Sequence, residues 1–324
     1  MMTNSTLKNL SNISPGTWII GKWHKQHYKV IKKLGSGANG VVYLAETSGG
    51  PAALKLSSST ESVTSEVNVL KTFAKVQGSS LGPSLLDVDD WETGNGMVPF
   101  YAMEYIKGTG LLSFIAQKDF SWAGILILQL LRDLQRIHEE GWVFGDLKPE
   151  NIIVTGSPVR IRCIDVGGMT RLGRSIKEFT EFFDRGYWGM GSRKAEPSYD
   201  LFAAAMIMVN LAYPQRFSKK ADSELQLKTA IHQSAELKKY EPVLINALKG
   251  KYQSAQEMRR ALLDLLAGRP QSRAETVQAD RKGGKPQSRL KIRRFKKTKR
   301  LITTITFIVI VSMLYFLYIY EQLL

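Results

Sequence analysis

The residues of this sequence best suited to chemistry are two acids and an amide in short polar segments. Residues 146–151 read Asp-Leu-Lys-Pro-Glu-Asn, and Asp165 follows the next apolar run. Mg²⁺ prefers hard oxygen ligands in near-octahedral geometry, which short carboxylate and amide side chains supply together with phosphate oxygens. The pattern therefore predicts a metal–nucleotide site built from Asp146, Asn151 and Asp165. A polar turn between two strands is the alternative.

A glycine-rich turn upstream could hold the phosphates of a nucleotide. Residues 34–42 read Leu-Gly-Ser-Gly-Ala-Asn-Gly-Val-Val, with glycines at 35, 37 and 40. Apolar residues on both sides predict a hairpin, whereas a dinucleotide-binding fingerprint needs a strand that leads into a helix. In such a turn, backbone N–H groups approach phosphates with no Cβ in the way. A flexible hairpin without a ligand is the alternative.

A lysine and a glutamate follow the turn. Lys55 ends a short apolar strand, where it is either an exposed edge charge or a partner of nucleotide phosphates. In the second case a helix glutamate must hold it. Glu66 is the candidate, because Val67 and Leu70 recur beside it at helical spacing. Glu61 is a weaker competitor, since it lies nearer the Ser/Thr-rich start of the segment.

In this order and spacing, the motifs over residues 27–268 resemble the bacterial Hanks-type (eukaryotic-like) Ser/Thr protein kinases. The resemblance implies an α+β fold with two lobes, a β-rich N-lobe over residues 27–105 and a helical C-lobe over residues 106–268. It implies ATP and Mg²⁺ as cofactors, with Mn²⁺ as a substitute, and Ser/Thr residues of proteins as substrates. The end of the domain and the segments after it are similar to those of membrane-anchored kinases from Bacillus-type sporulating bacteria, which implies a connection with sporulation.

The resemblance assigns a role to each motif residue. Asp146 accepts the proton of the attacking hydroxyl, and Lys148 neutralises the transferred phosphate. Asn151 and Asp165 bind the metal. The remaining residues are expected around the nucleotide: Leu34, Gly35, Gly37, Gly40, Val42, Ala53, Lys55 with its partner Glu66, Ile153, and the main chain of Glu104 and Ile106 at the hinge.

The sequence departs from the family at three points. Phe144-Gly145 replaces the family's His-Arg, and because that Arg binds a phosphate on the activation segment, we expect less dependence on phosphorylation there. Asp165 is followed by Val instead of Phe, which keeps the metal ligand. No Ala-Pro-Glu is recognised, since Ala195-Glu196-Pro197 comes too soon before Asp200, the expected start of a helix. The candidate autophosphorylation sites are Thr170, Ser175 and Thr180.

The length and the cysteine count restrict the class of protein. The chain has 324 residues, enough for a two-lobed domain and further segments. Its one cysteine, Cys163, excludes an intrachain disulfide and fits a reducing compartment; we expect it to be buried and inert. Residues 1–26 lack the pattern of a signal peptide and are expected to form a loose N-terminal tail that becomes ordered around Trp18 to Trp23.

The C-terminal part of the sequence predicts a membrane anchor. Residues 301–320 carry no charge, and twenty helical residues span about 30 Å, the thickness of the bilayer core. Residues 269–300 contain thirteen Lys/Arg and two acids. Positive residues beside a span stay in the cytoplasm. The prediction is a single-pass protein of the cell membrane, with the kinase domain cytoplasmic and residues 321–324 outside.

The basic linker, residues 269–300, has three interpretations. It could attract anionic lipid, bind DNA without sequence preference, or dock an acidic protein. Our hypothesis is that polyanion binding raises activity by concentrating the enzyme or by forming a homodimer.

Two other function classes compete with a protein kinase. A catalytically weak pseudokinase scaffold is favoured by the changes before Asp146 and after Asp165. A small-molecule kinase of the amino-sugar type is favoured by Phe144-Gly145-Asp146, although Lys148-Pro149-Glu150-Asn151 argues against it.

Overall fold

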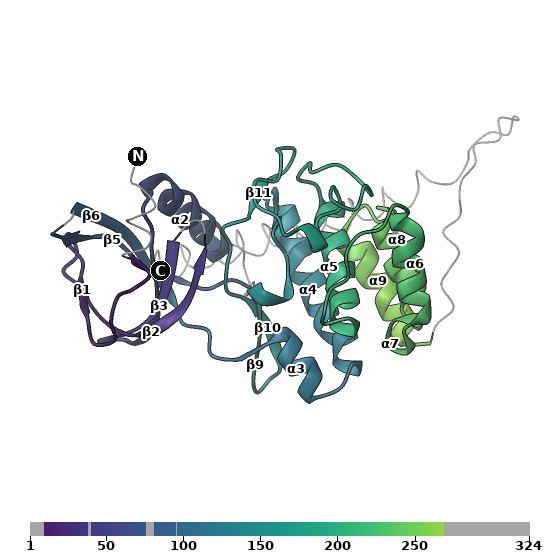
Figure 1. Ribbon diagram of the computed structural model, residues 1–324, viewed down its shortest axis with the longest axis horizontal. Coiled ribbons are helices and arrows are strands. Elements are labelled where there is room, and N and C mark those ends of the chain that lie inside the picture. The colour runs from purple at the N-terminus through teal and green to yellow at the C-terminus, as the bar shows by residue number, and fades with distance from the viewer. Residues whose placement is uncertain (1–9, 38–39, 76–80, 95, 269–324) are drawn as a thin grey trace, which may run out of the picture. The chain divides into compact units, whose positions relative to one another are not determined.

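A computed structural model describes residues 10–37, 40–75, 81–94 and 96–268 (Figure 1). The chain divides into two compact units, Met1–Gln271 and Ser272–Leu324, and every described residue belongs to the first. The basic linker, the expected span at 301–320 and the tail at 321–324 lie outside the described residues. Among the described helices, none is long and apolar enough to cross a membrane.

The N-lobe is an antiparallel sheet of six strands in the order β1-β2-β3-β4-β6-β5, with helix α2 against β5 and β6. Alternate residues of its strands face two hydrophobic clusters, because successive side chains of a strand point to opposite faces. Leu54 and Phe100 face one cluster, and Ala53 and Tyr101 face the other, which continues into the C-lobe. The element bounds are β1 Trp18–Ile20, β2 His27–Gly37, β3 Gly40–Thr47, β4 Gly50–Leu56, α2 Thr60–Lys75, β5 Leu85–Thr93 and β6 Gly96–Glu104.

Residues before His27 are part of this lobe, so it extends beyond the boundary expected at residue 27. Strand β1 pairs with β2. Leu10 is buried, and its carbonyl accepts a 2.6 Å hydrogen bond from the Tyr43 hydroxyl. The tail expected over residues 1–26 is therefore folded onto the sheet from residue 10 onward.

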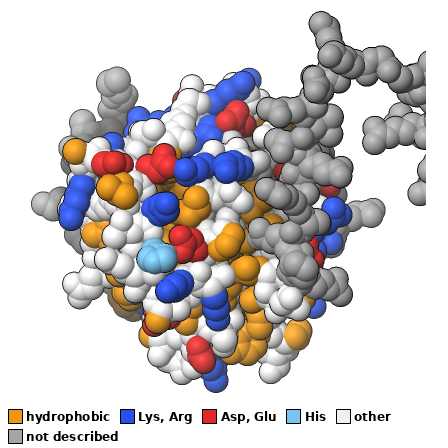
Figure 2. Space-filling view, turned by 90° about the vertical axis from the view of Figure 1, so that its right-hand side faces the viewer, with side chains coloured by type: hydrophobic (Ala, Val, Ile, Leu, Met, Phe, Trp, Pro, Cys, Tyr) orange, Lys and Arg blue, Asp and Glu red, His pale blue; other side chains and the backbone are white. Residues whose placement is uncertain are grey.

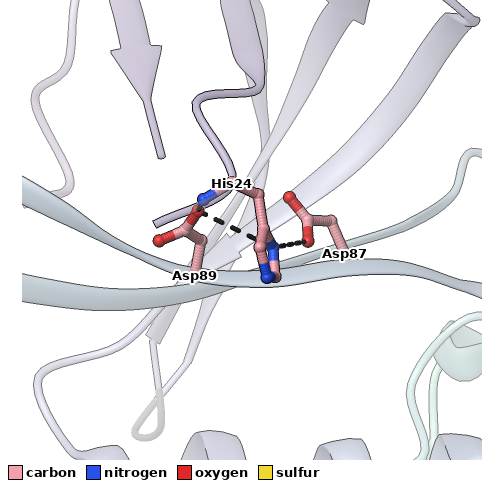
Figure 3. Close-up of side chains that lie close together, drawn as sticks. All are labelled: His24, Asp87 and Asp89. Carbon is pink, nitrogen blue, oxygen red and sulfur yellow. Dashed lines mark hydrogen bonds and ion pairs between the residues drawn. The ribbon is translucent and has the colours of Figure 1, made fainter. Parts of the chain in front are cut away.

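A cluster of His24, Asp87 and Asp89 fastens this N-terminal segment to β5 (Figure 3). Nδ1 of His24 lies 2.6 Å from Asp87 Oδ1, and the main-chain N–H groups of Trp23 and His24 donate to Asp89 at 2.9 and 2.8 Å. The hydrogen bond to Asp87 raises the pKa of His24. Because the carboxylates already accept these hydrogen bonds, the cluster is a structural anchor.

The C-lobe is built around α5, whose residues Tyr199 to Leu211 are all buried. A helix that is apolar on all sides has to lie in the centre of a lobe, and α4 and α8 contact it. Three short strands, β7, β9 and β10, form a small sheet beside them. The element bounds are β7 Thr109–Gly110, α3 Leu111–Gln117, α4 Ser121–Glu139, β8 Trp142–Val143, η1 Pro149–Asn151, β9 Ile152–Thr155, β10 Arg160–Cys163, β11 Thr170–Arg171, η2 Glu181–Phe183, α5 Pro197–Ala212, α6 Ser223–Gln233, α7 Ala235–Lys238, α8 Glu241–Leu248 and α9 Ala255–Leu266.

Candidate active site

The lysine, the helix glutamate and the second acid meet between the two lobes. Lys55 Nζ, at the end of β4, donates to Glu66 Oε2 on α2 at 2.5 Å. It also lies 3.9 Å from Asp165 Oδ1. Lys55 and Glu66 are only 8% and 4% exposed, so this charge pair is almost removed from water. Glu61 instead accepts a hydrogen bond from the Ser59 hydroxyl, which leaves Glu66 as the partner of Lys55.

Tyr101 is a third member of this group that the sequence did not predict. Its hydroxyl donates to Glu66 Oε2 at 2.6 Å, so the same oxygen accepts from Lys55 and from Tyr101. Burial, followed by the charge of Glu66, raises the pKa of Tyr101 well above its usual value. The hydroxyl therefore stays protonated and remains a donor. It joins α2 to β6 of the sheet.

The catalytic-loop segment places Asp146 between two donors. Lys148 Nζ donates to Asp146 Oδ2, and the Thr180 hydroxyl donates to Asp146 Oδ1 at 3.0 Å. Lys148 also reaches the Thr180 oxygen at 3.1 Å. Asn151 Nδ2 donates to the Asp146 carbonyl at 3.1 Å and fixes the loop between them. Thr180, expected only as a phosphorylation site, thus contacts both ends of the Asp146–Lys148 pair.

The main chain of this loop is held by Asp200 of α5. Its carboxylate accepts from the N–H groups of Phe144 and Gly145 at 2.8 and 3.0 Å, and Nε2 of His138 lies 2.8 Å away. Asp200 is fully buried. Gly145, which replaces the family's Arg, has φ +84°, and a Cβ there would lie 2.4 Å from the Gly168 carbonyl oxygen. A side chain at this position is therefore strained and sterically excluded.

The segment that carries Asp165 packs against both Glu66 and Asp146. The Ile164 N–H donates to the Asn151 carbonyl at 2.9 Å, which brings the two expected metal ligands onto neighbouring stretches of chain. The Asp165 side chain is 51% exposed. A Cβ on Gly168 would lie 2.8 Å from Asp146 Cβ, so glycine allows this close approach. The exposed carboxylate and the nearby amide fit a hard divalent cation.

The residues expected around the nucleotide surround the junction of the lobes. Gly40 lies against β4, where a Cβ would be 2.2 Å from the Leu56 carbonyl oxygen, whereas Gly35 and Gly37 have no neighbour among the described residues within 4 Å of a Cβ position. The first two glycines therefore leave open space and the third allows close packing of the strand. Val42 and Ile153 are half-buried, Ala53 and Ile106 are buried, and Leu34 is exposed.

The hinge segment is fixed by Glu104. Its carboxylate receives two 2.9 Å hydrogen bonds from Arg162 of β10, which lower the pKa of Glu104. The Ile106 N–H has no hydrogen-bond partner within the described part of the chain. This N–H group is thus free to donate a hydrogen bond to the base of a nucleotide.

The three candidate phosphorylation sites differ in accessibility. Thr170 is 5% exposed and bonds to the Gly168 carbonyl, Thr180 is half-buried beside Asp146, and Ser175 is exposed. Cys163 is buried, which raises the pKa of its thiol and keeps it protonated, as expected.

Comparison with known proteins agrees with this arrangement. A sequence profile described as a protein kinase domain matches residues 28–282. The serine/threonine-protein kinase YabT of Bacillus subtilis (strain 168) is 51% identical over 306 residues, covering 93% of this chain and 90% of that protein. The serine/threonine-protein kinase ArnS of Sulfolobus acidocaldarius is 25% identical over 272 residues, covering 68% of this chain and 43% of its own length. PknG of Mycobacterium leprae is 29% identical over 174 residues, covering 50% of this chain and 22% of its own length.

The family resemblance expected from the motifs is confirmed by the match to the kinase domain and by the similarity to YabT. Members of this family use ATP with a divalent metal. With its β-rich N-lobe, helical C-lobe and these relatives, the chain belongs to the Ser/Thr protein kinases.

Proposed function

We propose that this kinase transfers the γ-phosphate of ATP to Ser and Thr hydroxyls of proteins at the site formed by Asp146, Lys148 and Thr180. The observation that carries the proposal is the joint placement of Asp146 beside Lys148 and of Lys55 beside Glu66 and Asp165. Phosphoryl transfer depends on positioning and on neutralising charge more than on covalent chemistry. A site already held by hydrogen bonds suits that requirement.

Each side chain then has a task. Asp146 orients the substrate hydroxyl and accepts its proton, and Lys148 supplies positive charge next to the transferred group. Lys55, held by Glu66, pairs with the phosphates. Asn151 and Asp165 hold Mg²⁺, or Mn²⁺ in its place, and a bound cation neutralises the charge of the phosphates.

The nucleotide base would bind at the hinge. The Ile106 N–H, which lacks a partner in the described residues, is the proposed donor to the adenine ring. Glu104 contributes through its main chain, since its side chain is engaged by Arg162. Val42, Ala53 and Ile153 provide the apolar surface above and below the ring, and Leu34 with Gly35, Gly37 and Gly40 covers the nucleotide.

A labelled-phosphate assay tests this function. The full chain is incubated with γ-labelled ATP, Mg²⁺ and a generic protein substrate, in parallel with the Asp146→Asn variant. We expect label on Ser and Thr for the wild type and a loss of about 10²- to 10⁴-fold in the variant, the range for removal of a general base. Nucleotide binding without any transfer would support the scaffold alternative, and transfer to amino sugars but never to protein would support the small-molecule alternative.

We propose further that residues 301–320 anchor the kinase in the cell membrane and that the basic linker binds DNA or anionic lipid. Support comes from the uncharged run and from the thirteen Lys/Arg against two acids. The match to YabT covers 93% of the chain, so the unmatched residues at the chain ends are too few to reach residues 269–300. The similarity to YabT therefore extends beyond the catalytic domain into the basic linker. About 1 kcal/mol for each basic residue near an anionic surface makes strong attraction reasonable.

Replacing the thirteen Lys/Arg of the linker by Gln tests its role. The variant is compared with the wild type for binding to duplex DNA and to vesicles with or without phosphatidylserine, and for activity with each. We expect both the binding and any stimulation to be lost, and a change in oligomeric state on binding would support dimer formation. Unchanged polyanion affinity and activity would refute the proposal.

A further inference from the structure

The segment between the Asp165 motif and Thr180 forms an exposed basic ribbon. Main-chain hydrogen bonds of 2.7–2.8 Å pair residues 173–176 with residues 193–195. Ser175 lies opposite Lys194 in this antiparallel pair. We call residues 173–177 together with 193–195 the basic ribbon.

The two faces of the ribbon differ in character. Ile176 and Ala195 are buried in a small cluster with Val143 and Tyr199. Because side chains alternate along a strand and opposite residues share a face, Ser175, Lys177 and Lys194 lie together on the outer face. All three are exposed.

The outer face carries positive charge that the protein itself does not neutralise. Residues 166–177 and 185–195 contain no Asp or Glu. The side chains of Lys177 and Lys194 form no hydrogen bond or ion pair with the described residues. The exposed Arg174 side chain forms none either, although Arg174 lies opposite Ala195 and not on the outer face. Like charges on neighbouring strands repel each other, so an anionic partner would stabilise this face.

Nearby acids are already engaged elsewhere. Asp184 is buried and pairs with Arg193 at 2.7 Å, and Glu196 pairs with Arg185 at 2.7 Å. Although Lys194 is close enough to Glu196 to contribute to its lowered pKa, the hydrogen bond from Arg185 is the main cause.

The acid of the catalytic segment is engaged in the same way. Glu150, four residues after Asp146, pairs with Arg216. Glu178, which follows Lys177 directly, is also not without a partner. Glu181, directly after Thr180, is exposed. The other carboxylates named here are engaged, and so is Arg193 of the ribbon, whereas the side chains of Lys177 and Lys194 are not.

The ribbon lies next to the point of phosphate transfer. Lys177 lies three residues before Thr180. The Thr180 hydroxyl contacts Asp146. At the other end, β11 pairs with β8, which leads directly into the catalytic loop. A chain that places its hydroxyl at Asp146 therefore passes close to the ribbon.

We propose that the basic ribbon docks acidic residues of the substrate protein, so that the kinase prefers Ser and Thr flanked by Asp or Glu. The proposal rests on the proposed protein kinase function and names the substrate class of that same site. The charge of the ribbon and its place beside Asp146 favour a peptide segment as the occupant.

Steady-state kinetics with the full chain tests it. Peptides of equal length carry one Ser, flanked on either side by Glu, by Gln or by Lys. Two exposed ion pairs predict a kcat/KM about 2- to 30-fold higher for the Glu peptides than for the Gln peptides. The double variant Lys177→Glu with Lys194→Glu should lose this preference and favour the Lys peptides.

A matched control changes the same net charge elsewhere. Lys228 on α6 and Lys251 after α8 are exposed and lie in the helical end of the C-lobe, where further Lys and Arg side chains are spread among hydrophobic ones (Figure 2). The variant Lys228→Glu with Lys251→Glu should keep the wild-type preference. A phosphate on Ser175 would occupy the same face as the peptide, so each preparation is checked by intact mass.

Two outcomes would overturn the proposal. One is an equal kcat/KM for Glu and Gln peptides, and the other is a preference that survives in the Lys177→Glu and Lys194→Glu variant, whether or not that variant loses DNA binding. Transfer to no peptide and no protein would instead overturn the proposed function, and this proposal with it.

Discussion

Removing the Tyr101 hydroxyl is expected to weaken the Lys55–Glu66 pair without altering the shape of the site. In Tyr101→Phe, Glu66 keeps Lys55 but loses the buried 2.6 Å hydrogen bond that joins α2 to the sheet. A hydrogen bond to a charged group contributes about 1.5–3 kcal/mol. This free energy stabilises the position of α2 in which Glu66 pairs with Lys55. Its loss shifts the equilibrium between this position and displaced positions of α2 by about 10- to 150-fold.

The assay is kcat and KM for ATP together with the free energy of unfolding. We expect kcat/KM for ATP to fall about tenfold, within the limit set by the hydrogen bond. In a Glu66→Gln background, adding Tyr101→Phe should change kcat/KM less than about twofold, because the charge that the hydroxyl serves is gone. The pKa of Tyr101 lies well above its usual value, so the effect should not vary with pH across the neutral range.

Tyr28→Phe is the matched control. The Tyr28 hydroxyl also donates to a carboxylate, Asp87, at 2.8 Å, but Tyr28 belongs to the hydrophobic cluster on the other face of the sheet. Both variants should lose stability, and only Tyr101→Phe should lose activity toward ATP. If the two variants lose stability alike and neither changes kcat/KM, the reasoning is refuted, and the Tyr101 hydroxyl supports the fold alone.

Three further predictions concern the catalytic loop and the N-terminal anchor. Thr180→Val should lower kcat by about 10- to 100-fold, because it removes a hydrogen bond to Asp146, the proposed base. Thr180→Ser should retain most of the activity in the same kinetic assay. Gly145→Ala should lower the free energy of unfolding by more than Gly173→Ala, since both glycines have φ +84° but only a Cβ at Gly145 meets another atom within 4 Å. The pKa of His24 is raised above its usual 6.5, so its contribution to stability is complete below that pH and is lost as the pH rises through the raised value. The melting temperature should therefore decrease from pH 6 to pH 8, and His24→Gln should reduce that decrease.

Different results would contradict each of these. Equal kcat for Thr180→Val and wild type would mean that the hydroxyl does not position the catalytic pair. Equal stability of the two glycine variants would show that the backbone conformation alone sets the cost. A pH dependence that is unchanged in His24→Gln would assign it to other groups.

The motif residues were predictable because each lies in a short segment whose local pattern determines its structure. Lys55 and Glu66 are only eleven positions apart, yet α2 begins at Thr60 and turns Glu66 toward the sheet. The two-lobed fold was predictable for the same reason, since alternating strands come before long helical stretches.

Contacts that depend on pairing of distant segments were not predictable. Tyr101 reaches Glu66 because β6 lies beside β4 with Tyr101 opposite Lys55, and this register is not visible in either segment alone. Thr180 reaches Asp146 because the activation segment folds back over 34 positions of the chain. The anchoring of residues 10–26 likewise depends on carboxylates of β5, more than sixty positions away.

The buried carboxylate of Asp200 also affects how such kinases are recognised from sequence. It holds the loop through the N–H groups of residues 144 and 145, which every amino acid except proline possesses. The loop can therefore keep its course without the family's His and Arg side chains, as it does here with Phe144 and Gly145. Searches that demand His-Arg before the catalytic aspartate would miss enzymes of this kind, whereas a pattern that links Asp-x-Lys to a later buried aspartate at the start of an apolar helix would retain them.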